Sequence, residues 1–208
     1  MLKDYKYYRA IAQSGDLVLC SGAGKISKAI IASAKRNKKK PVTIVVKTKI
    51  DPPYKGEIMF TDDFYYSHIG VIVVIYGHLF IIEANGKTVD LRRFSDAYKR
   101  YKGKVHIYKM SNHYFDEIIK VPKRKFIRNL LALEGNKYDW KGVLQQLWNE
   151  IKIFAKNHSE NNQLYCSELV NLAANYYWGG EEVWVTPHDI GYNEWKAGNF
   201  LCELKDIK

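Results

Sequence analysis

The sequence predicts an α+β fold from the order in which strand-like and helix-like segments occur. Apolar runs of strand length, bounded by turn residues, fill the first half of the chain, and residues 69–76 form the longest of them. Segments with apolar residues at helical spacing follow at residues 123–133, 140–154 and 164–178. Strands followed by helices are typical of α+β domains, because α/β domains alternate the two kinds of element.

The strands of the first half are expected to form an antiparallel meander. They are predicted at residues 17–20, 67–76, 79–84, 88–91 and 105–109, with a last strand at residues 200–204. The connections at Gly77-His78 and Asn85-Gly86 are short enough for hairpins, and short connections favour antiparallel neighbours. Helices are predicted from near Gly24 to residue 34 and at residues 94–101, whereas residues 184–190 read as a loop with a short turn.

Residues 35–66 interrupt this meander. A strand at residues 42–50, a Pro- and Gly-containing turn at residues 51–56 and a returning strand at residues 57–61 predict a hairpin outside the core. We therefore expect one domain over residues 1–208, with an insertion at about residues 35–66 beside a cleft. The basic run at residues 35–40 is either a solvated loop or an anion site.

The composition limits the class of protein. With 208 residues, 47% of them hydrophobic, the chain can bury the core of a single domain. Its 33 Lys and Arg against 22 Asp and Glu give a formal charge of +11. Such a charge favours anionic partners such as nucleic acid, anionic lipid or an acidic polymer, or serves solubility alone. The sequence contains no recognised nucleic-acid-binding motif, so nucleic acid is the least expected of these partners.

The cysteines and the apolar runs bear on the compartment. Three cysteines, Cys20, Cys166 and Cys202, occur without a paired CxxC spacing, which predicts a reducing compartment and no disulfide framework. The first residues lack the apolar region of a signal peptide, and the longest apolar run is too short to span a bilayer. A cytoplasmic location is therefore expected.

Cys166 is the first candidate for chemistry. The polar residues 158–162 make poor helix interior, so a helix is predicted to begin between residues 164 and 167, with Cys166 at or near its first turn. Unpaired backbone N–H groups and the positive end of the helix dipole favour a thiolate there. A cysteine so placed is either a nucleophile, if a histidine reaches it, or a buried structural residue.

His68 and Glu83 are predicted to meet across a hairpin. If the turn centres on residues 76–77, residue 68 pairs opposite residue 85, and residue 83 is its diagonal neighbour on the same face. Diagonal neighbours lie about 7–8 Å apart, within reach of long side chains. Glu83 would then orient His68 for a thiol, as in a Cys-His-carboxylate triad. A satisfied histidine at a strand mouth and a surface carboxylate beside a turn are the structural alternatives.

A set of short motifs, in this order along nearly the whole chain, resembles a known family. They are Gly15-Asp16-Leu-Val-Leu, Ser67-His68-Ile-Gly70-Val, Ile82-Glu83-Ala, Lys137-Tyr138-Asp139-Trp140, Tyr165-Cys166-Ser167-Glu168-Leu-Val and Thr186-Pro187-His-Asp189-Ile. The set is similar to the permuted papain-like amidases, the YiiX/YebB-like and poxvirus-related branch of the NlpC superfamily of cysteine peptidases. The long insertion at residues 35–66 departs from the family pattern.

The resemblance implies a circularly permuted papain-like (NlpC-type) fold, in which an antiparallel sheet packs against helices that include the nucleophile helix. It implies Cys166 as nucleophile, His68 as general base and Glu83 as the orienting residue. Backbone N–H groups at the start of the Cys166 helix are natural oxyanion donors. Tyr165, Ser167 and Asp16 are further candidates for oxyanion or substrate contacts.

The expected activity is hydrolysis of an amide through a thioester, as in an amidase or peptidase acting on cell-wall peptides or acylated amino acids. A lipid acyltransferase or thioesterase of related permuted fold is an alternative, and a basic nucleic-acid-binding module with a structural cysteine is an alternative of another class. The substrate is expected to be a small molecule, peptide or lipid-like compound with an amide or ester. No cofactor is expected, and no metal, because the histidines lack metal-ligand spacing with the cysteines.

Overall fold

A seven-stranded sheet forms the centre of the computed structural model, which describes residues 2–22, 24–50, 56–101, 103–139, 143, 163–178 and 185–204. The strand order is β1-β11-β8-β2-β5-β6-β7, and neighbours run antiparallel except β1 and β11, which are parallel. The bounds are β1 Leu2–Lys3, β2 Leu17–Gly22, β5 His68–Ile75, β6 His78–Ala84, β7 Val89–Arg93, β8 Gly103–Tyr108 and β11 Phe200–Leu204. Strands β2, β5, β6 and β7 have the order of the expected antiparallel meander, whereas β8 returns to pair with β2 instead of β7. The chain ends are added at the edge beyond β8.

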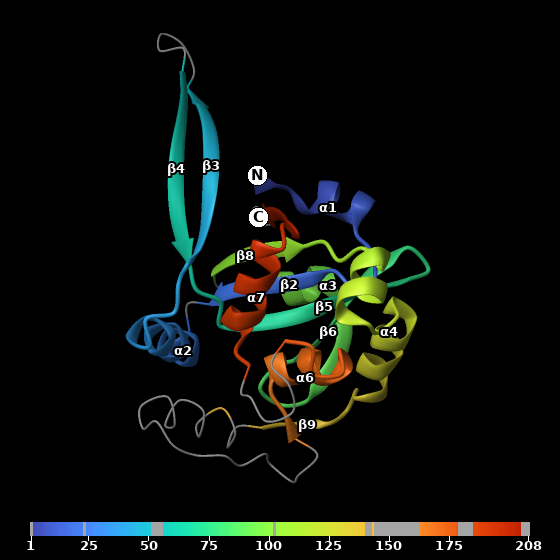
Figure 1. The fold of residues 1–208 in the computed structure, drawn as a ribbon. Coiled ribbons are helices and arrows are strands. Elements are labelled where there is room, and N and C mark those ends of the chain that lie inside the picture. The colour runs from blue at the N-terminus through green and yellow to red at the C-terminus, as the bar shows by residue number, and fades with distance from the viewer. Residues whose placement is uncertain are drawn as a thin grey trace.

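Helices pack on both faces of this sheet, because side chains of successive strand residues alternate between two apolar clusters. Leu19, Ile69 and Val71 face one cluster, together with residues of α4 and α6. Val18 and Ile72 face the other, together with residues of α1 and α3. Figure 1 shows α4, α6 and α7 on the near side of the sheet. The bounds are α1 Tyr5–Ile11, α2 Lys25–Arg36, α3 Phe94–Tyr98, the π-helix η1 Tyr114–Ile119, α4 Lys123–Ala132, α6 Cys166–Ala173 and α7 Pro187–Lys196.

The fold is thus α+β, with a mainly antiparallel sheet packed against helices, as the sequence predicts. A further pair of short parallel strands consists of β9 (Lys137–Tyr138), which follows α4, and β10 (Gln163–Leu164), which comes just before α6. The predicted helix at residues 140–154 lies outside the described residues, apart from Val143. Within the described ranges, no helix combines the length and hydropathy that crossing a bilayer requires.

The hairpin predicted within residues 35–66 is present. Strands β3 (Val42–Ile50) and β4 (Gly56–Phe64) pair antiparallel as a separate two-stranded sheet that projects from the body of the molecule (Figure 1). Its base is tied to α7, because Lys39 Nζ lies 2.9 Å from Asp189 Oδ2 and His188 Nε2 lies 2.9 Å from the Lys40 carbonyl. Part of the basic run is therefore occupied by an internal ion pair. The division into one domain with an insertion stays a prediction.

Two boundaries differ from the sequence prediction. Within the loop expected at residues 184–190, residues 187–190 are instead the start of α7, because Thr186 caps the helix by accepting from the Asp189 N–H at 3.2 Å and Pro187 occupies its first position. The Cys166 helix ends at Ala173 rather than near residue 178. Asn175 and Tyr176 take left-handed backbone angles in the turns that follow, which end the helix.

Candidate functional site

Cys166 is the first residue of α6. Tyr165, the residue before it, has extended backbone angles, and its carbonyl accepts the first helical hydrogen bond, from the Leu169 N–H at 3.0 Å. The N–H groups of Cys166 and Ser167 come before that bond, so they belong to the donors that a helix leaves unpaired at its start. Only 5% of Cys166 is exposed. The thiol therefore sits at the positive end of the helix dipole in a largely buried setting.

The β5–β6 hairpin brings His68 and Glu83 together. Ile75 pairs with His78 and Val71 with Ile82, so the register continues to residue 68 opposite residue 85, as expected. His68 Nε2 and Glu83 Oε2 are 2.5 Å apart. Gly70 lies opposite Glu83 in this register, and a Cβ there would come within 3.2 Å of the Glu83 Cβ. The same Cβ would come within 2.6 Å of the Ile81 Cδ1, so a glycine at residue 70 leaves room for Ile81 and for the first carbon of the Glu83 side chain.

Two residues that the sequence argument did not single out also bind Glu83. Arg92 Nε donates to Oε1 at 3.0 Å and its Nη2 contacts the same oxygen, while the Tyr101 hydroxyl donates to Oε2 at 2.5 Å. Glu83 is fully buried, so it needs these partners to remain ionised. Arg92 pairs with Ile81 across β6 and β7, which makes it a diagonal neighbour of Glu83 on the same face of the sheet, so the register of this hairpin is a signal that could have identified it. Tyr101 follows α3, and no local pattern links it to Glu83.

These contacts set the charges of the pair. Burial alone would lower the pKa of His68, but the Glu83 carboxylate and the Cys166 side chain, which also hydrogen-bonds the ring, raise it to about 10. Burial alone would raise the pKa of Glu83, but His68 and Arg92 lower it to about 2. The pair is therefore an imidazolium and a carboxylate at neutral pH. Because Nε2 bonds Glu83, Nδ1 is the ring nitrogen left for Cys166.

Cys20 is the second thiol in this region. It pairs with His68 across β2 and β5, and only 2% of it is exposed. Burial, and then the charges of Glu83 and Cys166, raise its pKa well above the ordinary value. Cys202 is equally buried on β11, and all three cysteines are free thiols. Burial therefore does not separate Cys166 from the other two, whereas its helix start and its contact with His68 do.

The three secondary candidates have different surroundings. Tyr165 precedes Cys166, and its N–H donates to Glu168 at 3.5 Å. Ser167 is fully buried, and among the described residues its hydroxyl has no hydrogen-bond partner. Both stand beside the thiol in the chain.

Asp16 is placed elsewhere. Its carboxylate is fully buried and accepts from the Tyr8 hydroxyl at 3.2 Å, the Gln13 N–H at 3.0 Å and the Met110 N–H at 3.3 Å. Cys20, not Asp16, is the residue of this segment that faces His68. Within the described residues, the contacts of Asp16 thus join α1, the residues just before β2 and the residues just after β8, and none of them is with Cys166, His68 or Glu83.

The described part of the chain contains no group of three His, Cys, Asp or Glu side chains placed to hold a metal ion. The expectation that neither metal nor cofactor is needed stays a prediction.

Comparisons with known proteins give a likeness to solved structures without a sequence match. No family model matches the chain, and no curated protein sequence matches it. Among solved structures, the metalloprotein YiiX from Escherichia coli O157:H7 (DUF1105) is similar, with a TM-score of 0.47 and 17% sequence identity. The match covers 79% of this chain and 66% of that one, so the chain spans somewhat less than two thirds of the YiiX structure.

Proposed function

We propose that the protein is a cysteine hydrolase in which Cys166 is the nucleophile, His68 its proton partner and Glu83 the residue that orients His68. The observation that carries the proposal is the bonding of one His68 nitrogen to a buried carboxylate at 2.5 Å while the ring also meets the thiol at the start of α6. A nucleophile, a base and an orienting third group define this kind of site.

The first chemical step is attack of the Cys166 sulfur on the carbonyl carbon of an amide or ester. The C–S bond forms as the carbonyl π electrons move to oxygen, and the imidazolium of His68 then protonates the leaving amine or alcohol as its bond to carbon breaks. This leaves a thioester on Cys166 and a neutral His68. Water, deprotonated by His68, attacks the thioester and releases the acid and the thiolate.

The negative oxygen of each tetrahedral intermediate needs donors. The Cys166 and Ser167 N–H groups at the start of α6 are the proposed pair, because neither has an intrahelical acceptor. Glu83 supports the imidazolium through charge, and Arg92 and Tyr101 hold Glu83 in place. They are positioning residues, since Arg92 contacts Glu83, and Tyr101 contacts Glu83 and lies with its ring centre 5.9 Å from that of His68.

The substrate proposal remains at the level of class: a peptide, small molecule or lipid-like compound with an amide or ester. The permuted papain-like fold belongs to the same proposal and rests on the resemblance of the motifs. Transfer of the acyl group to an acceptor other than water would use the same first step.

Hydrolysis of an activated aryl ester tests the proposal directly. The wild-type protein should release the phenol with a burst equal to one thioester per chain, and the acylated peptide should contain Cys166. Cys166→Ala should abolish both signals, whereas the matched variant Cys202→Ala should keep them. Equal turnover in Cys166→Ala and wild type would rule out the nucleophile assignment.

A further inference from the structure

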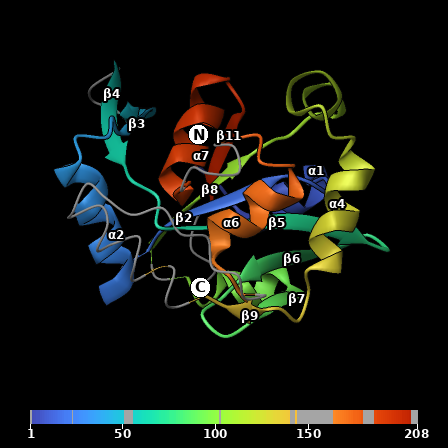
Figure 2. The same ribbon diagram turned by 60° about the horizontal axis from the view of Figure 1, so that its bottom comes forward.

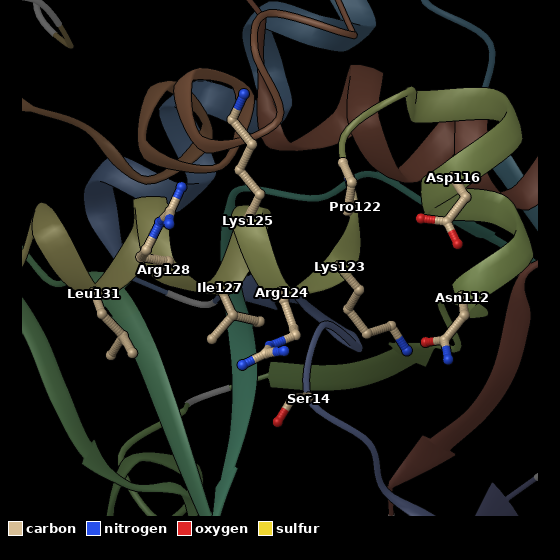
Figure 3. Close-up of a pocket in the computed structure, with 10 residues that line it drawn as sticks. All are labelled: Ser14, Asn112, Asp116, Pro122, Lys123, Arg124, Lys125, Ile127, Arg128 and Leu131. Atoms are coloured by element: carbon tan, nitrogen blue, oxygen red, sulfur yellow. The ribbon is translucent and has the colours of Figure 1, made fainter.

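A groove of about 900 Å³ lies beside α4, away from Cys166. Four cations of α4 line it, Lys123, Arg124, Lys125 and Arg128, together with Ser14 and Asn112 (Figure 3). Ser14 places the groove relative to β5, because the Ser14 hydroxyl accepts a hydrogen bond from the Val74 N–H at 2.8 Å. Val74 is six residues along β5 from His68, which is about 20 Å at the usual rise of a strand. The groove is therefore separate from the candidate catalytic site.

The charge of the groove is only partly compensated, because Asp116 is the acidic residue in a lining that contains four cations. Within the described part of the chain, no carboxylate forms an ion pair with Arg124, Lys125 or Arg128. The first turn of α4 contains no acidic residue, and Pro122 at its N-cap supplies no side-chain acceptor. Cations at the positive end of a helix are unfavourable. A bound anion would relieve this arrangement.

Two of the four cations extend toward the hydroxyl and amide groups of the lining, and the other two extend away from them (Figure 3). Figure 3 shows Lys123 and Arg124 extending toward Ser14 and Asn112, while Lys125 and Arg128 extend from the opposite side of α4. The Ser14 hydroxyl already accepts one bond, so its proton is left to donate. Lys123 is held at the inner end, with its Nζ 5.5 Å from the centre of the Phe115 ring.

The opposite part of the lining is apolar. Ile127 and Leu131 are half-buried and stand one turn apart on α4, beyond the cations. Arg and Lys with hydroxyl and amide donors are the usual partners of phosphate oxygens. A groove with this donor set and an apolar wall suits a ligand that has both a phosphate group and an apolar part.

We propose that this groove binds the phosphate group of an amphiphilic ligand, with the phosphate against Ser14, Lys123 and Arg124 and the apolar part against Ile127 and Leu131. The inference goes beyond the proposed cysteine chemistry and does not depend on it. The phosphate can belong to a soluble ester or to the headgroup of a lipid, and the experiment separates the two sources.

The test measures binding of two probes to the full chain at fixed ionic strength: glycerol 3-phosphate by calorimetry, and phosphatidylcholine vesicles with and without phosphatidylglycerol by sedimentation. The variant Lys123→Gln/Arg124→Gln removes one Lys and one Arg from the groove. The matched control, Lys28→Gln/Arg36→Gln, removes the same charges from exposed positions on α2, which lies on the other side of the molecule from α4 (Figures 1 and 2).

The groove variant should weaken binding by about tenfold or more, and the control by less than about twofold, because only the groove variant removes charge-assisted hydrogen bonds. Asn112→Asp, which adds a carboxylate without changing size, should weaken it as well. Binding of glycerol 3-phosphate supports a soluble ester, and binding confined to anionic vesicles supports a lipid headgroup.

Equal weakening by the groove variant and the control would attribute binding to net charge and overturn the proposal, as would wild-type protein that binds neither probe. Cys166→Ala should bind as wild type does, so failure of the cysteine mechanism would leave this result unaffected.

Discussion

Replacing Glu83 by Gln should lower the pKa of His68 by removing the buried charge that faces its ring. Burial alone lowers the pKa of His68, and the Glu83 charge is the largest influence that raises it. Gln keeps the size of Glu and can still accept from the Tyr101 hydroxyl, but it has no charge. The pKa of His68 should therefore fall from about 10 toward its ordinary value of 6.5, with the Cys166 side chain left as the group that still raises it.

The size of the effect follows from these pKa values. The difference between 6.5 and about 10 corresponds to about 5 kcal/mol, at about 1.4 kcal/mol for each tenfold change in proton affinity. His68 keeps 22% of its side chain exposed, and screening by water makes this an upper value. Loss of one partner from a buried charge pair costs about 3–5 kcal/mol of folding stability.

The pH dependence of stability has a defined sign. The lowered pKa of Glu83 stabilises the fold above about 4.5, and this contribution is lost as the pH falls toward about 2. The raised pKa of His68 stabilises the fold below 6.5, and this contribution is lost as the pH rises through about 10. Glu83→Gln should therefore flatten the stability profile at both ends of the pH range.

NMR titration of ring-labelled histidine gives the answer, with the His68 signal assigned by its absence from His68→Ala. Glu203→Gln is the matched control, because Glu203 contacts the ring of another buried histidine, His106, at 3.3 Å. It should leave the His68 titration unchanged. A His68 pKa that stays near 10 in Glu83→Gln would refute the electrostatic account of the pair.

Two further outcomes are expected. Burial, with a smaller contribution from Asp139, raises the pKa of Glu168 from 4.5 to about 7, so the fold loses stability as the pH rises through that interval. In thermal unfolding, Glu168→Gln should therefore stabilise the protein by up to about 3 kcal/mol near pH 8 and by almost nothing near pH 4. An equal change in stability at the two pH values would contradict this prediction. Tyr101→Phe removes a hydrogen-bond donor to Glu83, so it should lower the free energy of unfolding in urea by about 1–3 kcal/mol. It should also lower kcat more than it raises KM. The control Tyr76→Phe, at an exposed position, should change neither stability nor kinetics.

Local patterns predicted much of the fold. Alternating apolar runs and turn residues located β5, β6, β11 and the β3–β4 hairpin, because strand periodicity and tight turns are properties of neighbouring residues. The capping box at Thr186 was also a local signal for α7, although the proline beside it suggests a loop at first sight. Helix α1 begins with a similar signal, the Asp4 side chain accepting from the Tyr7 N–H at 2.7 Å.

In the candidate site, too, local patterns predicted some residues, whereas others come together only through tertiary packing. The hairpin register placed Glu83 diagonally from His68, and the polar stretch before residue 164 indicated a helix start at Cys166. The partners that keep Glu83 ionised come from segments farther along the chain, and Tyr101 in particular meets it only through tertiary packing. Asp16 shows the reverse case, because its motif suggested a site residue while its contacts are those of a buried structural carboxylate.

The central claim is that His68 makes Cys166 a reactive thiol, and competitive alkylation tests it most directly. Iodoacetamide at about pH 6 should label Cys166 before Cys20 and Cys202, because an ordinary thiol is protonated at that pH, whereas Cys166 has the start of α6 and the His68 ring to favour its thiolate. His68→Ala should slow the labelling of Cys166, and Glu83→Gln should slow it less. Peptide mapping in which Cys20 or Cys202 is labelled first, or in which His68→Ala leaves the Cys166 rate unchanged, would contradict the account.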